Sequence, residues 1–221
     1  QWTAQEGLYP NVADRVKGEK LDTEHKKDYL TTKQVARLLG AIDRSTLKGL
    51  RDYAMLSVMV TTGLREISIV RADIGDIRTA GDAVALFYQG KGHEEKADYV
   101  KLAEPVEEAV RAYLKARGGA DPKAPLFSSI ANRNNGERMT TRSVSRVAKE
   151  RLIAVGLESD RLTGHSMRHT AATLNLLNGG TVEETRQLLG HTNINTTLIY
   201  SHALERAKNN SEERIAKAIF G

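Results

Sequence analysis

The sequence has no cysteine among its 221 residues, so disulfide bonds, thiolate metal ligands and cysteine nucleophiles are excluded. It also lacks any apolar run of about 18 residues, the length that a membrane-spanning helix needs. No signal-peptide pattern opens it. These absences predict a soluble, cytoplasmic protein with no membrane partner.

The charge balance is only mildly basic. The chain carries 33 basic and 28 acidic residues, a formal net charge of +5, with a pI near 9.4. Many proteins that never meet nucleic acid carry a similar excess, so the charge favours a nucleic-acid partner only weakly. The function therefore has to be sought in motifs.

The first segment, residues 1–28, has the composition of a linker. It is polar, is interrupted by Pro10, and begins with Gln1 rather than Met. Trp2 and Leu8 fit the remnant of a preceding helical domain. We therefore expect a fragment or processed chain in which residues 1–28 are a linker or the remnant of a preceding domain.

Apolar spacing and helix caps predict a mostly helical domain over residues 29–203. Helices are expected at about 31–39, 47–61, 105–117 and 140–155, with a tail helix in residues 204–221. Between residues 74 and 102 the apolar residues alternate and turn signals recur, which predicts about three antiparallel strands. The expected fold class is mainly α with a small antiparallel β-sheet (α+β).

The stretch from residue 163 to 200 concentrates polar groups suited to work on a phosphodiester. Glycines at 179, 180 and 190 divide it into short helical pieces, and Thr181 and Glu184 are spaced as a capping box that restarts the chain. Short helices and tight turns can fold separated side chains towards one another. The four candidate functional residues in this stretch are His165, Arg168, His191 and Tyr200.

The order of these motifs resembles the tyrosine recombinase (phage integrase) family. The resembling strings are H-x-x-R at 165–168, L-L-G-H-T at 188–192, a tyrosine nine residues after that histidine, T-G-L-R at 62–65 and G-K-G at 90–92. H-x-x-R alone is a weak signal, but the ordered set spans residues 31–200. The resemblance implies six catalytic residues: Arg65, Lys91, His165, Arg168, His191 and Tyr200.

The resemblance implies DNA strand cleavage with no metal and no other cofactor. Tyr200 is the expected nucleophile and forms a 3′-phosphotyrosyl bond, which retains the energy needed to rejoin the strand without ATP. Arg65 and Arg168 are the expected clamp on the non-bridging oxygens, because a guanidinium stays charged and donates two parallel hydrogen bonds.

The remaining roles complete the proton transfers. The family's hairpin lysine matches Lys91, which would protonate the leaving 5′ oxygen, with Lys96 in the same loop as an alternative. His165 is the candidate base for the nucleophile, or a phosphate donor, and His191 is expected to hydrogen-bond the phosphate. Taken without the resemblance, Lys91 is an ordinary solvated turn lysine.

Arg65 also has an ordinary interpretation, as a solvated arginine in the first turn of a helix. The family commonly has an acidic residue three positions after this arginine, whereas here Ser68 stands there and Glu66 follows Arg65 directly. The sequence therefore leaves open what orients Arg65.

Two surfaces are candidate contacts with partners. Arg142, Arg146 and Lys149 lie on one side of the helix at 140–155, which in similar recombinases enters the major groove, and Lys96 is a further candidate DNA contact. A basic helix face is more often only solvated. The apolar residues of the tail helix are expected to dock on a neighbouring protomer or, as an alternative, on their own domain: Ile215, Ile219 and Phe220.

The histidines also invite a zinc hypothesis, because His165 and His169 are four residues apart. It is disfavoured because H-E-x-x-H and cysteine are missing and Arg168 between the two histidines would repel a cation. His169 is better explained as a packing or supporting residue.

The predicted function is a site-specific recombinase or integrase acting as a homotetramer on double-stranded DNA, for integration or excision of a mobile element. Two alternatives remain: a type IB topoisomerase-like enzyme, and a DNA-binding relative without catalysis. If a DNA-clamping domain is missing, affinity for DNA should be weak and strongly salt-dependent.

Overall fold

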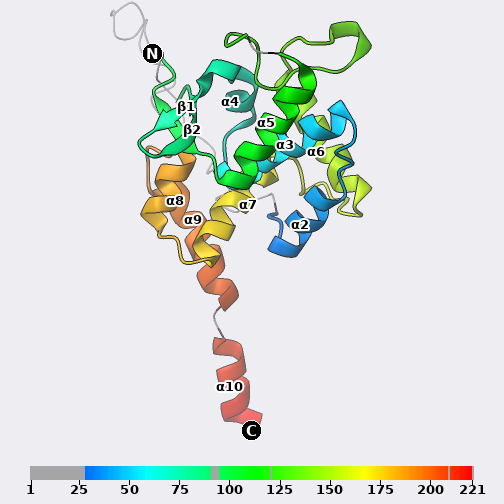
Figure 1. Ribbon diagram of the computed structural model, residues 1–221. Coiled ribbons are helices and arrows are strands. Elements are labelled where there is room, and N and C mark those ends of the chain that lie inside the picture. Colours follow the sequence, from blue (N-terminus) through cyan, green and yellow to red (C-terminus); the bar gives the residue numbers. More distant parts are fainter. Residues whose placement is uncertain (1–27, 91–94, 120, 209, 221) are drawn as a thin grey trace, which may run out of the picture.

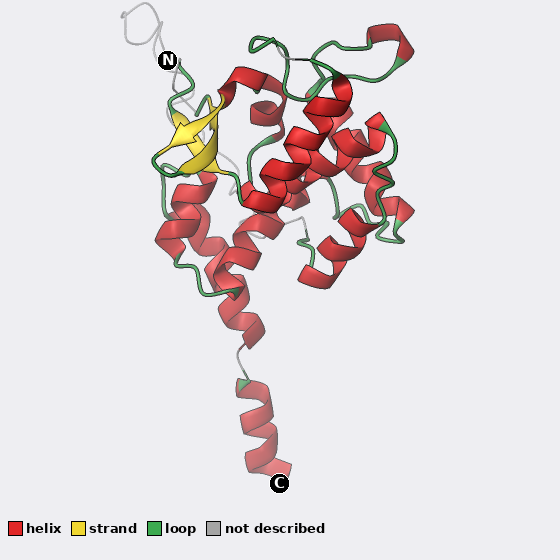
Figure 2. Cartoon of the chain, viewed as in Figure 1, coloured by secondary structure: helices red, strands yellow, loops and turns green. Residues whose placement is uncertain are grey.

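The structure is a computed structural model that describes residues 28–220 apart from 91–94, 120 and 209. It is mainly helical, with one small sheet at an edge of the body (Figures 1 and 2). The predicted fold class is confirmed. The helices are α2 (Thr32–Gly40), α3 (Leu47–Thr62), α4 (Glu66–Arg71), α5 (Glu104–Arg117), α6 (Thr141–Ala154), α7 (Gly164–Leu177), α8 (Val182–Leu189), α9 (Asn195–Lys208) and α10 (Ser211–Phe220), with short 3-10 turns η1 (Ile74–Asp76) and η2 (Asn132–Asn134).

Helix α3 is the centre of the core. Most of its residues are buried, and it packs against α5 and against α7. Thr46 caps its first turn and Gly63 ends it in the left-handed conformation (φ 65°), which glycine adopts without strain. A Cβ atom at Gly63 would lie 2.6 Å from the Leu189 side chain. The end of α3 therefore meets the end of α8 at a point where no side chain fits.

A buried charge network fastens α6 to α3. The carboxylate of Asp52, only 1% exposed, pairs with Arg51 on one oxygen and with Arg151 on the other, each at 2.6 Å. Buried charges need such partners, because an unpaired one would be costly away from water. The network orients the helix that leads into α7.

The sheet is antiparallel with the order β1 (Ile77–Ala80), β2 (Ala83–Tyr88), β3 (Asp98–Lys101). In the central strand, Leu86 and Tyr88 are both buried, as expected for alternate residues that share one face. Leu86 pairs with Val100 of β3 and Ile77 of β1. The sheet lies beside α8 (Figure 1), so β2 ends near the turn that follows that helix.

The C-terminal part of the chain is divided into separate helices near the glycines, as the sequence predicted. Helices α7, α8 and α9 are separated at residues 178–181 and 190–194, and the capping box of Thr181 and Glu184 starts α8. A small apolar cluster holds the three together through Ala172, Leu189 and Tyr200. The body ends with α9.

Helix α10 extends away from the body (Figure 1) and buries none of its residues. Ile215, Ile219 and Phe220 are 59%, 65% and 85% exposed. Among the described residues, no helix has both the length and the apolar character needed to cross a membrane.

Candidate active site

Arg168 is the structural centre of the site. It lies in the second turn of α7, is 4% exposed, and donates from Nη1 to the carbonyl of Gly63 and from Nη2 to that of Leu189, both at 2.6 Å. Both carbonyls end helices, where partial negative charge collects and favours a cation. The glycine-terminated ends of α3 and α8 thus hold the H-x-x-R arginine in place.

Arg65 lies beside it, and no anionic partner for it is found among the residues that the structure describes. It is the N-cap of α4 and is partly buried, and within the described residues its side chain makes no hydrogen bond or ion pair. The pKa of Arg168 is lowered to about 10, first by burial and then by the positive charge of Arg65. Neither guanidinium is paired with a carboxylate in the part of the chain that the structure describes. Two such cations side by side form a site that an anion would neutralise.

Glu66 does not act as the missing acidic partner of Arg65. Its Oε1 accepts a hydrogen bond from Ser145 Oγ of α6 at 2.5 Å. A Cβ atom at Gly164, the first residue of α7, would lie 2.1 Å from the same oxygen. Glu66 therefore ties α4 to α6 and to the start of α7, and Ser68 is buried beneath it in α4.

His191 is a neutral, fixed imidazole at this site. Its side chain is buried, and Nδ1 lies 2.9 Å from Thr197 Oγ1 of α9. Burial, followed by the charges of Arg168, Arg65 and Arg186, lowers its pKa to about 4. At neutral pH it is uncharged. If Thr197 donates to Nδ1, the opposite nitrogen carries a proton for a ligand.

Tyr200 lies on α9 against Ala172 and Leu189 and is only 6% exposed. Burial raises the pKa of its hydroxyl, while the nearby charges of Arg168 and Arg65 act to lower it. The nucleophile proposed from the sequence is thus within the electrostatic field of both arginines. Positive charge nearby favours the phenolate form of a tyrosine.

His169 lies directly beside the ring of Tyr200, a position that the sequence did not predict. Its ring lies edge-on to that of Tyr200, with centroids 4.9 Å apart, and to that of His165, with centroids 5.7 Å apart. His165 is exposed, whereas His169 is buried. The four-residue spacing of the two histidines on α7 is the signal that could have placed them in one row.

Tyr88 is a further side chain at this site, and no motif pointed to it. It is the last residue of β2 and is 7% exposed. A Cβ atom at Gly190 would lie 3.0 Å from its hydroxyl oxygen. The phenol therefore reaches the turn that immediately precedes His191.

The four predicted DNA-contact residues have different surroundings. Arg142 and Arg146 are exposed on α6, with Arg146 3.7 Å from Glu150 in a solvated pair. The ammonium of Lys149 instead donates to the carbonyl of Ser159 at 2.6 Å. Arg142 and Arg146 therefore remain the better placed of this set for a phosphate.

Lys96 is also engaged by the protein itself. Its ammonium pairs with Asp73 at 2.7 Å and with Asp76, and it donates to the carbonyl of Arg71. This favours a structural role for Lys96, as a bridge from the loop to η1. Lys91 lies outside the described residues.

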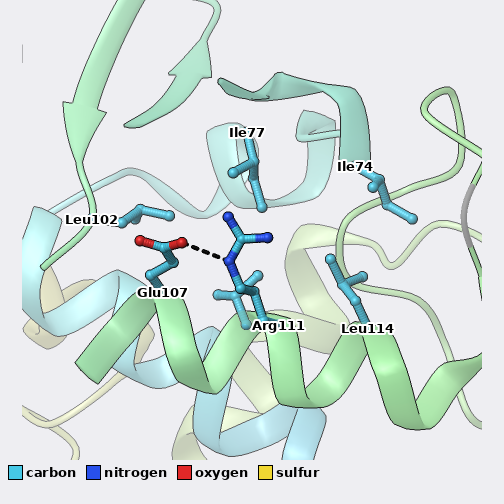
Figure 3. A pocket seen from close by; sticks show the side chains of 7 residues that line it. Ile74, Ile77, Leu102, Glu107, Arg111 and Leu114 are labelled. Atoms are coloured by element: carbon cyan, nitrogen blue, oxygen red, sulfur yellow. Dashed lines mark hydrogen bonds and ion pairs between the residues drawn. The ribbon is translucent and has the colours of Figure 1, made fainter. Parts of the chain in front are cut away.

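Among the described residues, a group of metal ligands or an apolar pocket would be another candidate site. Across the described ranges, no three His, Asp or Glu side chains are grouped as metal ligands would be. An apolar pocket of about 220 Å³ lies between η1, the sheet and α5 (Figure 3). Its charged residues, Glu107 and Arg111, pair with each other at 2.6 Å. The pocket shares no residue with the arginine site.

Comparison with known proteins agrees with the geometry. The model of the phage integrase family matches residues 28–206. The tyrosine recombinase XerC of Caldanaerobacter subterraneus subsp. tengcongensis is 32% identical over 195 residues, which are 87% of this chain and 52% of that protein. The XerC protein of Chlamydia muridarum is also 32% identical, over 90% of this chain and 61% of its own length. The chain thus spans roughly half to two thirds of these relatives.

Solved structures show the same fold. The XerA recombinase is 28% identical and superposes with a TM-score of 0.67 over 90% of this chain and 67% of that one. The XerH recombinase in a post-cleavage complex with its difH substrate is 20% identical, with a TM-score of 0.70 over 91% of this chain and 55% of that one. Together with the match to the family model, these likenesses confirm the resemblance found in the sequence. The chain belongs to the phage integrase family of tyrosine recombinases.

Proposed function

We propose that this chain is the catalytic part of a site-specific recombinase that cuts and rejoins DNA strands through a covalent 3′-phosphotyrosyl intermediate. The observation that carries the proposal is the pair Arg65 and Arg168, two neighbouring cations without a carboxylate partner in the described residues. Tyr200 and a neutral His191 lie in the field of the same two charges. A phosphodiester supplies the anion that this arrangement lacks.

In the proposed reaction, the Tyr200 oxygen attacks phosphorus and the bond from phosphorus to the 5′ oxygen breaks. The phenol proton passes to a base, for which His165 is the candidate and His169 the neighbouring ring. The leaving 5′ oxygen takes a proton from Lys91, a role that rests on the resemblance alone. Attack by the 5′ hydroxyl of another strand on the phosphotyrosine then rejoins DNA and releases the tyrosine.

The arginines would stabilise charge on the non-bridging oxygens. Arg168 is already fixed by two backbone carbonyls, so it needs little reorganisation when the phosphate arrives. Neutral His191 would donate a hydrogen bond without adding a third positive charge. Fixed donors of this kind commonly contribute on the order of 10²- to 10³-fold each to a rate.

The wider assembly is part of the same proposal. The substrate is double-stranded DNA at a recombination site, contacted by the exposed Arg142 and Arg146 of α6, and four protomers act together. Integration or excision of a mobile element is the proposed biological task. The greater length of the relatives supports a further DNA-binding domain in the whole protein.

The test is covalent trapping on a nicked suicide substrate built from the recombination site of the source element, with metal chelated. We expect a protein–DNA adduct on denaturing gels for the wild type and none for Tyr200→Phe. Tyr99→Phe is the matched control, because Tyr99 is an exposed strand residue outside the site. An adduct that persists in Tyr200→Phe would contradict the proposal. So would the absence of any adduct from a longer form of the protein that binds the DNA.

A further inference from the structure

Tyr88 is a buried residue, and its hydroxyl has no hydrogen-bond partner among the described residues. Buried hydroxyls in folded proteins nearly always have one, so an exception calls for an explanation. Tyr113, a fully buried tyrosine of the main core, follows the rule, because its hydroxyl lies 3.0 Å from Ser128 Oγ. Within the described residues, nothing satisfies the Tyr88 hydroxyl, so it is available to a ligand.

The surroundings of this hydroxyl indicate what that ligand is. The position of a Cβ at Gly190 is 3.0 Å from it, which places it at the turn before His191. The charges of Arg168 and Arg65 both act on the phenol. The Tyr88 hydroxyl thus lies next to Gly190, the neighbour of the Leu189 carbonyl that Arg168 binds, and one anion bound there would answer both the two cations and the hydroxyl donor.

We propose that the Tyr88 hydroxyl donates a hydrogen bond to a non-bridging oxygen of the scissile phosphate, as a further catalytic residue beside Arg65, Arg168 and His191. The inference rests on the proposed function, because it takes the anion to be the phosphodiester under attack. It assigns the two phenols of the site opposite tasks. Tyr200 loses its proton to attack phosphorus, and Tyr88 keeps its proton to hold the oxygen.

The electrostatics support this division. Burial, and then the negative charge of Asp98 across the β2–β3 pair, raises the pKa of Tyr88, while Arg168 and Arg65 act to lower it. Asp98 does not act on Tyr200 in the same way. Tyr88 is therefore held in the protonated form, which is the form that donates.

The experiment measures single-turnover adduct formation by wild type, Tyr88→Phe and the control Tyr113→Phe, which removes the hydroxyl of another buried tyrosine away from the site. On a normal phosphodiester we expect Tyr88→Phe to be slower by about 10- to 100-fold, with unchanged DNA affinity, and Tyr113→Phe to match wild type. The wild-type reaction tests the proposed function independently of Tyr88.

Methylphosphonate substrates then locate the contact. They replace one non-bridging oxygen by a methyl group, which cannot accept a hydrogen bond. We expect the Tyr88→Phe defect to disappear on one of the two diastereomers, the one whose methyl group takes the place of the contacted oxygen. Equal slowing on the diester and on both diastereomers would overturn the proposal, as would no slowing at all. Rescue of Tyr88→Phe by a sulfur in the leaving 5′ position would also overturn it, because it would assign Tyr88 to the leaving group.

Discussion

The two arginines of the site differ in what they do for the folded protein. Arg168 satisfies two buried helix-end carbonyls, whereas Arg65 makes no bond within the described residues. We expect Arg168→Gln to lower the free energy of unfolding by about 1 to 3 kcal/mol, because those carbonyls lose a charged donor. Arg65→Gln should leave stability unchanged or raise it, because it removes a like charge beside Arg168.

Urea denaturation of the two variants, with suicide-substrate trapping in parallel, checks this contrast. Both should lose most adduct formation. Equal destabilisation by the two substitutions would show that Arg65 is also a structural residue, and it would contradict the view of the site as two cations waiting for an anion.

His191 makes stability depend on pH in a defined direction. Its folded pKa of about 4 lies below the ordinary value of 6.5, so the unfolded chain binds the proton more readily. The contribution is present in full above pH 6.5 and is lost as pH falls towards 4. We expect His191→Asn to reduce the loss of stability across this window by on the order of 1 to 2 kcal/mol. Chemical denaturation at several pH values measures it, and an unchanged pH slope in the variant would count against a neutral buried imidazole.

At the scale of elements, the turn after α8 requires glycine at position 190 for two separate reasons. Gly190 has φ 58°, and a Cβ there would also lie 3.0 Å from the Tyr88 hydroxyl. Gly118, which ends α5 with φ 73°, has the same backbone requirement but open space around it. The two positions form a natural pair of test and control.

We expect Gly118→Ala to lower stability by about 1 kcal/mol, through backbone strain alone, and to leave adduct formation unchanged. Gly190→Ala should lower stability by at least as much and also slow adduct formation, because it displaces Tyr88 or the His191 turn. Thermal unfolding and single-turnover trapping separate the two effects. Equal activity in both variants would refute a functional contact between the sheet and this turn.

The sequence predicted the elements well because their signals are local. Capping boxes such as Thr181 with Glu184, and glycines such as Gly63, act within a few residues of themselves. The roles of Tyr88 and His169 could not be predicted in this way. The position of Tyr88 beside Gly190 depends on how the sheet packs on α8, and that of His169 on how α7 meets α9.

The same dependence on tertiary structure explains why two of the predicted DNA-contact residues, Lys149 and Lys96, have partners within the protein. Helical spacing alone placed Lys149 with Arg142 and Arg146, but it could not show that the loop after α6 supplies a carbonyl to the lysine. Lys96 likewise stood in a loop, and only the fold brings Asp73 and Asp76 to it. Charged side chains are predicted least well where tertiary structure provides a partner.

At the scale of the whole molecule, α10 is the helix that extends from the body and buries none of its residues. Its apolar stripe includes Ile219, which is 65% exposed, and a stripe of this kind normally packs against something. A second protomer is the proposed partner. Ile219→Asp should then leave the unfolding temperature of the free monomer unchanged and reduce the assembly of several protomers on one DNA, as seen by sedimentation at matched protein concentration.

The exposed Lys217 provides the control on the same helix, because Lys217→Ala changes charge without touching the apolar stripe. The comparison also separates the two destinations considered for the tail. If α10 docks on its own domain, Ile219→Asp removes a contact that stabilises the monomer, so the unfolding temperature falls even without DNA. If α10 docks on a neighbour, the defect is confined to the assembled complex and grows as protomers are diluted, because docking between protomers depends on concentration.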